Sequence, residues 1–387
     1  MKQVYRPTWA EINMDNLRKN FRNIRALLDE KTKFCAVIKA NGYGHGSVEL
    51  AKLYEEEGAD YFAVATCEEA LELRDAGIGT PLMCLGYVPE DRFGQMIERE
   101  VDVTIYSMEK AKRLSEEAVK RGKEAKVHIK LDTGMSRLGY PCREDSVGEI
   151  KEIAALPGVR CRGLFTHFAL ADSEDPSCTK EQFKRYLFVS ERLEQEGVEI
   201  EIRHVCNSAG VMMFPEYHLD MVRAGIVLYG HYPSEEVDKS VLRLYPAMSL
   251  RTTVAHVKTL EEGRGISYGH KYCTKREELI ATIPIGYADG FTRMLSGKAD
   301  VRIGENIVPV VGRICMDQCM LNVSGLDVRV GDTVTIFSEE EELAIERFGE
   351  RLGTINYELL CMIQRRVPRV YRSNGETTAV IDYLEGK

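Results

Sequence analysis

The sequence lacks a long apolar run. No uninterrupted apolar stretch reaches the roughly 18 residues that a membrane-spanning helix requires. The opening segment, MKQVYRPTWAEINMDNLRKN, also lacks the apolar core of a signal peptide. We therefore expect a cytoplasmic protein with no membrane contact.

An excess of positive charge and paired cysteine motifs are also missing. The 52 lysines and arginines are outnumbered by 61 acidic residues, and the net charge of −9 argues against a nucleic-acid partner. The 11 cysteines are scattered, and Cys315 and Cys319 do not form the Cys-x-x-Cys pairs of a zinc site. We expect a reducing compartment and no metal.

Internal repeats, low-complexity tracts and disordered linkers are absent as well. The chain has 387 residues, of which 44% are apolar. Two domains are expected, because a single core rarely grows past roughly 250–300 residues.

Up to about residue 235, short apolar runs alternate with amphipathic segments such as Met108–Arg121. This alternation predicts an α/β fold, a (β/α)8 TIM-like barrel over residues 1–240, with residues 1–11 pairing with the C-terminal domain. A doubly wound open sheet is the alternative, although no glycine fingerprint follows the first strand. The predicted strands are Phe34–Ile38, Tyr61–Ala65, Pro81–Leu85, Val101–Ile105, Val127–Leu131, Cys161–Phe165, Ile202–Cys206 and Met221–Val222, the last interrupted by Arg223.

After about residue 240 the pattern changes. Val, Ile and Thr become frequent, glycines mark turns, and long helices no longer separate the apolar runs. Residues 241–387 are therefore predicted to form a mainly β-strand domain. Its expected strands are Ala247–Leu260, Leu279–Ile285, Val301–Val311 and Thr333–Phe337, followed by helical segments near 341–351 and 356–364.

Lys39 ends the first predicted barrel strand, in the segment AVIKANGYGHG. Functional residues of such barrels lie at the carboxyl ends of the strands. Burial lowers the pKa of a lysine, and a neutral amine there is suited to forming a Schiff base with an aldehyde. On this segment alone, a lysine that simply extends to solvent is an equally good interpretation.

Other strand ends carry polar residues that strengthen the first interpretation. The fifth strand leads into HIKLDTGMSRLG, with Lys130, Asp132 and Arg137, and the sixth places His167 at the rim. The seventh strand carries His204 and is followed by Asn207 and Ser208. After the eighth strand, Gly225 and Ile226 offer backbone N–H groups to an anion, and phosphate sites after strands seven and eight recur in barrels.

These segments resemble those of bacterial alanine racemases, enzymes of fold-type III that depend on pyridoxal 5′-phosphate (PLP). The likeness extends over nearly the whole chain and rests on a highly specific combination of motifs. It includes AVIKANGYGHG, HIKLDTGMSRLG, THFALAD, NSAG, VRAGIVLYG, GISYGHKY, IPIGYADGF, VGRICMDQ and TINYE.

The resemblance implies a two-base racemisation of alanine on the external aldimine of PLP. Lys39 carries the cofactor as a Schiff base and is one base, and Tyr268 is the second base, on the opposite face of the substrate α-carbon. A histidine equivalent to His204 hydrogen-bonds this tyrosine. From the residues alone, the preferred interpretation of Tyr268 is an aromatic that packs at a strand end against the barrel.

The remaining site residues also follow from the resemblance. Arg223 faces the pyridine nitrogen and, because it stays charged, keeps that nitrogen unprotonated and discourages transamination. Arg137 contacts the phenolic oxygen and the substrate carboxylate, and Lys130, carbamylated in many relatives, holds Arg137 in place. His167 lies against the pyridine ring. The phosphate-binding set is Tyr43, Ser208, Gly225, Ile226 and Tyr357, and Asn207 is a further cofactor-binding residue.

The family pattern also implies a homodimer with shared active sites, in which Met316 and Asp317 form a substrate-side loop and, with Tyr268, serve the partner's Lys39. Gly42 departs from the pattern, since many relatives have alanine there. The implied role is D-alanine supply for peptidoglycan, and a duplicated catabolic enzyme is an equal alternative. Three alternatives stay open: a broader alanine and serine racemase, a related decarboxylase of basic amino acids, and a PLP-binding carrier protein.

Overall fold

A computed structural model describes residues 6–385 and divides them into two compact units. The barrel unit comprises Arg18–Gly42 and Ser47–Leu244. The C-terminal unit comprises residues 6–17, Tyr43–Gly46 and residues 245–385. No helix in the described residues is long and apolar enough to cross a membrane.

The barrel unit is built on eight parallel strands, which confirms the predicted fold class. In ladder order they are β10-β2-β3-β4-β5-β6-β8-β9. Backbone hydrogen bonds from Asp220 N to Arg203 O and from Arg223 N to Cys206 O link the two end strands, at 3.1 and 3.0 Å. The strands are β2 (Lys33–Val37), β3 (Tyr61–Val64), β4 (Leu82–Cys84), β5 (Val101–Ile105), β6 (Ala125–Asp132), β8 (Val159–Phe165), β9 (Ile202–His204) and β10 (Met221–Ala224); a short β7 (Tyr140–Pro141) pairs with β6.

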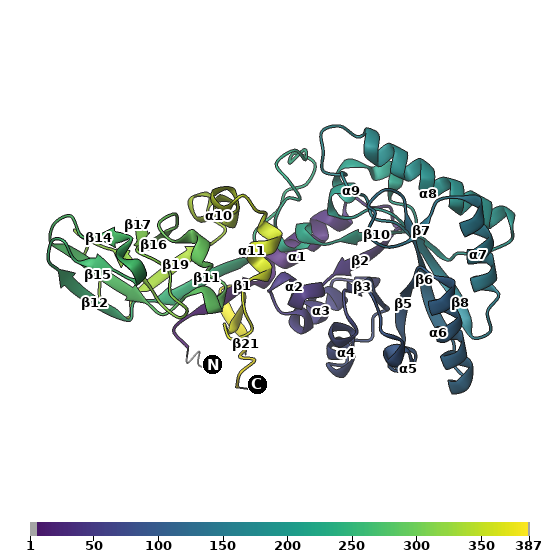
Figure 1. Cartoon of the computed structure of the whole chain (residues 1–387), viewed down its shortest axis with the longest axis horizontal. Coiled ribbons are helices and arrows are strands. Elements are labelled where there is room, and N and C mark those ends of the chain that lie inside the picture. Colours follow the sequence, from purple (N-terminus) through teal and green to yellow (C-terminus); the bar gives the residue numbers. More distant parts are fainter. Residues whose placement is uncertain (1–5, 386–387) are drawn as a thin grey trace. The chain divides into compact units, whose positions relative to one another are not determined.

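Helices cover the outside of these strands (Figure 1). Their starts carry the expected caps: Thr66 and Glu69 form a capping box on α4, and Ser107 caps α6, which ends at the left-handed Gly122. Because both faces of the strands are covered, β3, β4 and β5 are buried at every position. The helices are α1 (Met14–Arg25), α3 (Ser47–Glu56), α4 (Cys67–Asp75), α5 (Phe93–Glu98), α6 (Met108–Arg121), α7 (Glu144–Ala154), α8 (Ser177–Gln195) and α9 (Ser208–Met213).

The C-terminal unit is organised around a 10-stranded sheet with the order β12-β15-β18-β17-β16-β19-β11-β1-β20-β21. The N-terminal strand β1 (Trp9–Asn13) belongs to this sheet, where it pairs antiparallel with β11 and parallel with β20. The other strands are β11 (Met248–Thr253), β12 (His256–Leu260), β15 (Glu278–Ile283), β16 (Asp300–Ile303), β17 (Asn306–Val311), β18 (Cys319–Asn322), β19 (Thr333–Phe337), β20 (Arg369–Ser373) and β21 (Glu376–Ile381).

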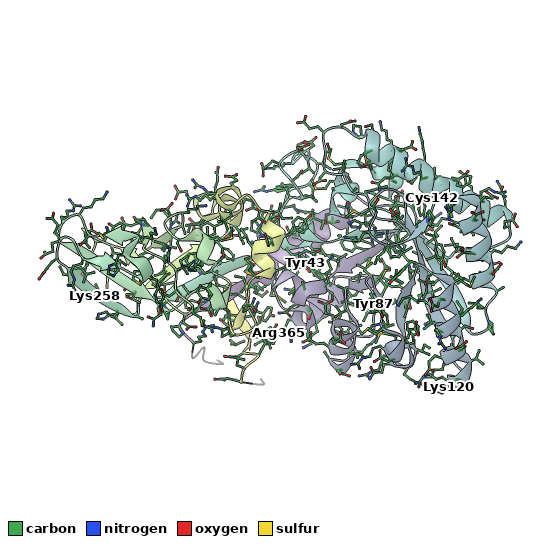
Figure 2. The ribbon with its side chains drawn as sticks, in the orientation of Figure 1. Tyr43, Tyr87, Lys120, Cys142, Lys258 and Arg365 are labelled. Atoms are coloured by element: carbon green, nitrogen blue, oxygen red, sulfur yellow. The ribbon has the colours of Figure 1, made fainter. Side chains whose placement is uncertain are left out.

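Smaller elements complete this unit. Strands β13 (Gly265–Ile266) and β14 (Tyr272–Cys273) form a separate hairpin, and helices α10 (Ile345–Leu352) and α11 (Asn356–Cys361) follow β19. Lys258 lies on the edge strand β12 (Figure 2), where a charged side chain discourages pairing with another chain.

Two predicted strands are each two strands in the structure. The run Ala247–Leu260 breaks at Val254 and Ala255, because β11 pairs with β19 and β1 whereas β12 pairs with β15. The run Val301–Val311 is the hairpin β16–β17, which turns at Gly304 with a φ of +56°.

Candidate active site

Lys39 stands at the carboxyl end of β2, after the buried Ile38. The segment labelled α2 (Lys39–Tyr43) is not a right-handed helix, because Ala40, Asn41, Gly42 and Tyr43 all have φ values between +49° and +59°. Such a run is costly for residues other than glycine. The left-handed conformation of this segment therefore has to be stabilised by hydrogen bonds.

Three hydrogen bonds within the barrel unit hold this turn. The Gly42 N–H donates to Ile38 O at 2.9 Å, and the Ser47 N–H donates to the Asn41 side chain at 3.2 Å. The Ala40 N–H donates to Glu69 Oε1 at 2.5 Å. Glu69, which the sequence analysis did not single out, fixes the backbone that directly follows Lys39.

Four basic side chains gather around His167. Burial, followed by the charges of Arg223, Lys130, Arg137 and Lys39, holds the pKa of His167 well below its ordinary value. His167 is therefore a neutral ring at neutral pH. The sequence-predicted residues of strands β2, β6, β8 and β10 thus meet at one end of the barrel.

Lys130 is a strongly perturbed lysine in this group. Burial, together with the charges of Arg223 and Arg137, lowers its pKa to about 7. Its Nζ donates to Leu131 O at 3.1 Å and lies 4.9 Å from the centre of the Phe165 ring. Arg137 is exposed, on a loop that the Asp132 carboxylate shapes by accepting from Gly134 N and Ser136 N.

Arg223 lies inside β10, paired with Cys35 of β2, and does not interrupt the strand. Its two terminal nitrogens donate to His204 Nδ1 at 2.8 Å and to the carbonyls of His204, Val205 and Thr166. Within the described residues its Nε–H has no acceptor. Burial lowers the pKa of Arg223 to about 10, so that it stays charged at neutral pH.

His204 has a partner at each ring nitrogen inside the barrel unit. Its Nδ1 faces Arg223, and its Nε2 lies 2.9 Å from His128 Nδ1. The expected hydrogen bond to Tyr268 stays a prediction. The ring is fully buried.

The predicted phosphate residues of the barrel unit lie at two helix starts. Ser208 begins α9, and its Oγ accepts from Gly225 N at 2.8 Å, directly before the short helix Ile226–Tyr229. Backbone N–H groups at helix starts favour anions. The Asn207 side chain caps α9 by accepting from Gly210 N and donates to Phe168 O, so its amide already has partners in the chain.

Tyr43 and Tyr357 are neighbours within the C-terminal unit. Their ring centres lie 6.1 Å apart, with Tyr43 on the loop after β2 (Figure 2) and Tyr357 in α11. The buried Arg369 joins the two segments: its Nε donates to Gly44 O at 2.8 Å, and its terminal nitrogens donate to Gln364 O, Val367 O and Ile363 O. Arg369 was not predictable from the sequence, because an arginine in a strand gives no sign that it is buried.

Tyr268 and Met316 are exposed in the C-terminal unit, with 68% and 52% of their surfaces accessible. Their loops touch within the C-terminal unit, since the Ser267 hydroxyl donates to Arg313 O at 2.6 Å and lies 3.4 Å from Cys315 Sγ. Asp317 forms an ion pair with Arg366 at 2.6 Å.

Comparison with known proteins assigns both units to one family. The family profile described as "Alanine racemase, N-terminal domain" matches residues 12–233, and the one described as "Alanine racemase, C-terminal domain" matches residues 247–371. An alanine racemase of Clostridium perfringens is 49% identical over 382 residues, covering 98% of this chain and 99% of that protein. One of Methanococcus maripaludis is 50% identical over 371 residues, covering 95% and 99%.

Solved structures give the same result. The alanine racemase of Clostridium difficile 630 has a TM-score of 0.96 at 50% identity and covers 99% of this chain and 100% of its own. A Bacillus anthracis alanine racemase with bound L-Ala-P has a TM-score of 0.92 at 38% identity and covers all of both chains.

Proposed function

The chain belongs to the alanine racemase family, and on this basis we propose that it interconverts L- and D-alanine by a two-base mechanism with PLP bound at Lys39. The observation that carries the proposal is the convergence of Lys39, Lys130, Arg137 and Arg223 on one neutral histidine. So much positive charge on one side of a barrel suits a ligand with several negative charges.

The residues of the barrel unit fit PLP. Its phosphate and phenolic oxygen are anionic, and its ring nitrogen accepts hydrogen bonds. The Arg223 Nε–H, which has no acceptor among the described residues, suits the ring nitrogen, and Arg137 suits the phenolic oxygen. Ser208, Gly225 and Ile226, which lie at two helix starts of the barrel unit, suit the phosphate.

When bound, PLP supplies an aldehyde that condenses with an amine and a ring that withdraws electrons from the substrate α-carbon. The protein supplies the proton transfers. Lys39 removes or returns the α-proton on one face, and Tyr268 does the same on the other face. A proton therefore leaves one side of the carbon while another arrives on the opposite side, which inverts the centre.

The protonation states of two side chains support this assignment. His167 stays neutral because its pKa is lowered, so it would lie against the pyridine ring of PLP as an uncharged side chain. Arg223 stays charged because its pKa, although lowered to about 10, lies well above neutral pH. A charged arginine gives no proton to the ring nitrogen, which limits side reactions that need a strong electron sink.

We further propose a homodimer in which Tyr268, Met316 and Asp317 of one subunit complete the site around Lys39 of the other. The support is the exposure of Tyr268 and Met316 in the single chain. The physiological role that we propose is D-alanine supply for peptidoglycan, from the cytoplasm.

The test mixes purified protein, PLP and pure L-alanine and follows the decay of circular dichroism, with L-serine in parallel and Lys39→Ala as control. We expect the signal to decay to zero with alanine and to stay constant with the variant. With serine we expect slower but detectable decay, because an apolar pocket disfavours an added hydroxyl without excluding it. Equal rates with both substrates would instead indicate a broader racemase. An absence of decay, despite a Schiff-base absorbance that Lys39→Ala removes, would indicate a carrier and overturn the proposal.

A further inference from the structure

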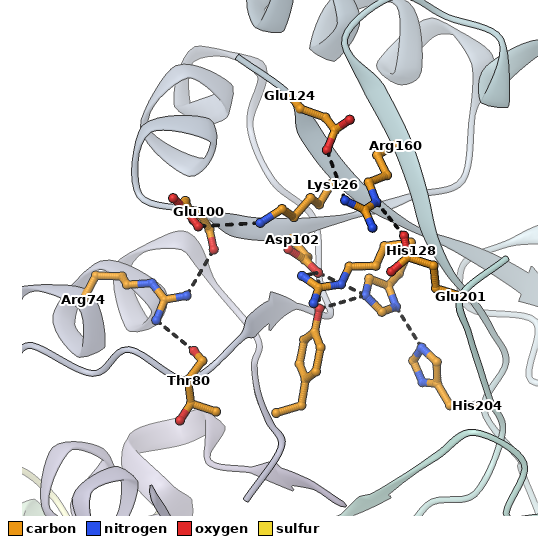
Figure 3. Close-up of polar contacts among 12 residues, drawn as sticks. Arg74, Thr80, Glu100, Asp102, Glu124, Lys126, His128, Arg160, Glu201 and His204 are labelled. Carbon is orange, nitrogen blue, oxygen red and sulfur yellow. Dashed lines mark hydrogen bonds and ion pairs between the residues drawn. The ribbon is translucent and has the colours of Figure 1, made fainter. Parts of the chain in front are cut away.

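A chain of buried hydrogen bonds runs from Arg223 through the barrel interior, across strands β10, β9, β6 and β5. Arg223 Nη1 meets His204 Nδ1 at 2.8 Å, His204 Nε2 meets His128 Nδ1 at 2.9 Å, and His128 Nε2 meets Asp102 Oδ2 at 3.2 Å. Figure 3 shows the part from His204 to Asp102. All four side chains are at most 3% exposed.

The direction of every hydrogen bond in this chain is dictated by its first member. A guanidinium only donates, so His204 Nδ1 must accept and the His204 proton must lie on Nε2. That N–H donates to His128 Nδ1, which places the His128 proton on Nε2, facing the Asp102 carboxylate. The hydrogen-bond directions therefore assign both rings the same tautomer, with the proton on Nε2.

The series of hydrogen bonds ends at the carboxylate of Asp102, which several neighbours hold in place. Burial opposes its ionisation, yet its interactions with His128, Tyr61 and Arg162 keep the pKa of Asp102 below its ordinary value. The Tyr61 hydroxyl donates to Oδ2, and Arg162 Nη1 lies 3.4 Å from the same oxygen. An ionised Asp102 is an acceptor only, so it enforces the His128 tautomer from the opposite end.

The neighbouring strand β8 is shaped around these rings. A Cβ at Gly163 would lie 2.0 Å from His128 Nδ1, so any other residue there would displace the ring. The β6–β8 register shifts between Val127 and His128. His204 stacks on Phe165 with ring centres 4.8 Å apart and planes within 2°.

We propose that His128 and Asp102 are positioning residues for the reaction. They hold His204 in the tautomer whose Nδ1 accepts from Arg223, and this fixes the guanidinium so that its Nε–H is directed to the cofactor ring nitrogen. With the opposite tautomer, His204 would present an N–H to the Arg223 N–H, and the guanidinium would have to move. Only the last link, from Arg223 to the cofactor, rests on the proposed function.

The first test reads the tautomers directly. Full-length protein labelled with 15N at histidine is studied by NMR with and without PLP, and the single variants His128→Gln and His204→Gln assign the two signals. We expect both rings to carry one proton, on Nε2, in both states. A His204 ring protonated on Nδ1, or on both nitrogens, would overturn the proposal whether or not the protein racemises alanine.

The second test compares His128→Gln with His128→Leu. Glutamine can still accept from His204 and donate to Asp102, whereas leucine can do neither, so we expect leucine to weaken PLP binding about tenfold and glutamine to restore most of it. His256→Leu, on exposed strand β12, is the control and should change nothing.

A merely structural effect of His128→Leu is separated by repeating the pair in an Arg223→Lys background. If His128 acts through Arg223, the leucine effect on PLP affinity disappears there. An undiminished effect in that background, or equal losses for glutamine and leucine, would contradict the proposal. A wild-type protein that binds PLP but fails to racemise alanine would refute the proposed function alone.

Discussion

Lys130 shows how strongly the barrel interior changes a single side chain. In water a lysine has a pKa near 10.4, but burial and two neighbouring guanidinium groups lower the pKa of Lys130 to about 7. About half of these amines are then neutral at neutral pH. Only a neutral amine reacts with CO₂, forming a carbamate and releasing a proton, and the same guanidinium groups that disfavour the ammonium stabilise that anion.

Carbamylation of Lys130 should therefore increase with pH in a range where exposed lysines stay inert. At fixed CO₂ pressure, we expect the carbamate signal in 13C NMR to rise from pH 6 to pH 8, as the neutral fraction grows from about one tenth to about nine tenths. Lys130→Arg should lack the signal, and Lys258→Arg, at an exposed position, should retain it. No carbamate signal at any pH would contradict the prediction.

The chemistry-bearing residues of the barrel were predictable because strand ends are visible in the sequence. Lys39, Lys130, His167 and Arg223 all follow or close apolar runs, and parallel strands bring such ends together. Glu69 and Asp102 were not predictable as part of the site. Glu69 resembles an ordinary helix-capping acid, and Asp102 resembles a solvent-facing residue of an alternating strand.

At the scale of elements, the left-handed turn after β2 is the least expected feature. The turn begins at Lys39 and is followed by Gly44 and Gly46. These two glycines pack against other atoms of the C-terminal unit. A Cβ at Gly44 would lie 2.4 Å from Leu360 O, and one at Gly46 would lie 1.8 Å from the Tyr371 hydroxyl. No alanine fits at either position without movement.

Gly44→Ala and Gly263→Ala should separate backbone strain from packing. Their φ values, +82° and +80°, are nearly equal, but nothing lies within 4 Å of a Cβ at Gly263. We expect Gly263→Ala to lower the free energy of unfolding by about 1 kcal/mol and Gly44→Ala by at least about 2 kcal/mol more, as measured by urea denaturation. Equal losses would show that the close approach at Gly44 is not tight.

The predicted element boundaries agree best with the structure where the strands are buried on both faces. The eight barrel strands and helix α6 matched the apolar runs, because both faces of each strand are covered. In the C-terminal sheet, β18, β20 and β21 were missed, because these short strands carry polar residues on their open face and form only by long-range pairing. The split between β11 and β12 likewise depends on partners distant in the sequence.

At the scale of the whole molecule, the proposed active site needs two subunits. Mixing Lys39→Ala with Tyr268→Phe subunits should restore activity, because a hybrid dimer contains one site with both bases. If equal amounts of the two variants reassociate at random, about a quarter of all sites should contain both bases. Racemase activity is measured after the subunits have exchanged under native conditions.

The matched control mixes Lys39→Ala with the Lys39→Ala/Tyr268→Phe double variant, which generates no intact site. If the first mixture stays as inactive as its parents, although native mass spectrometry detects hybrids, both bases belong to the same subunit and the shared-site proposal is wrong.

The most direct test of the two-base mechanism follows the α-proton in D₂O by NMR for Tyr268→Phe, with the exposed Tyr87→Phe as control. We predict that the Tyr268 variant still exchanges the α-proton of D-alanine, where Lys39 acts, while exchange of L-alanine and racemisation fall by at least about a hundredfold. Equal loss of exchange with both enantiomers, or racemisation at the control rate, would contradict the account.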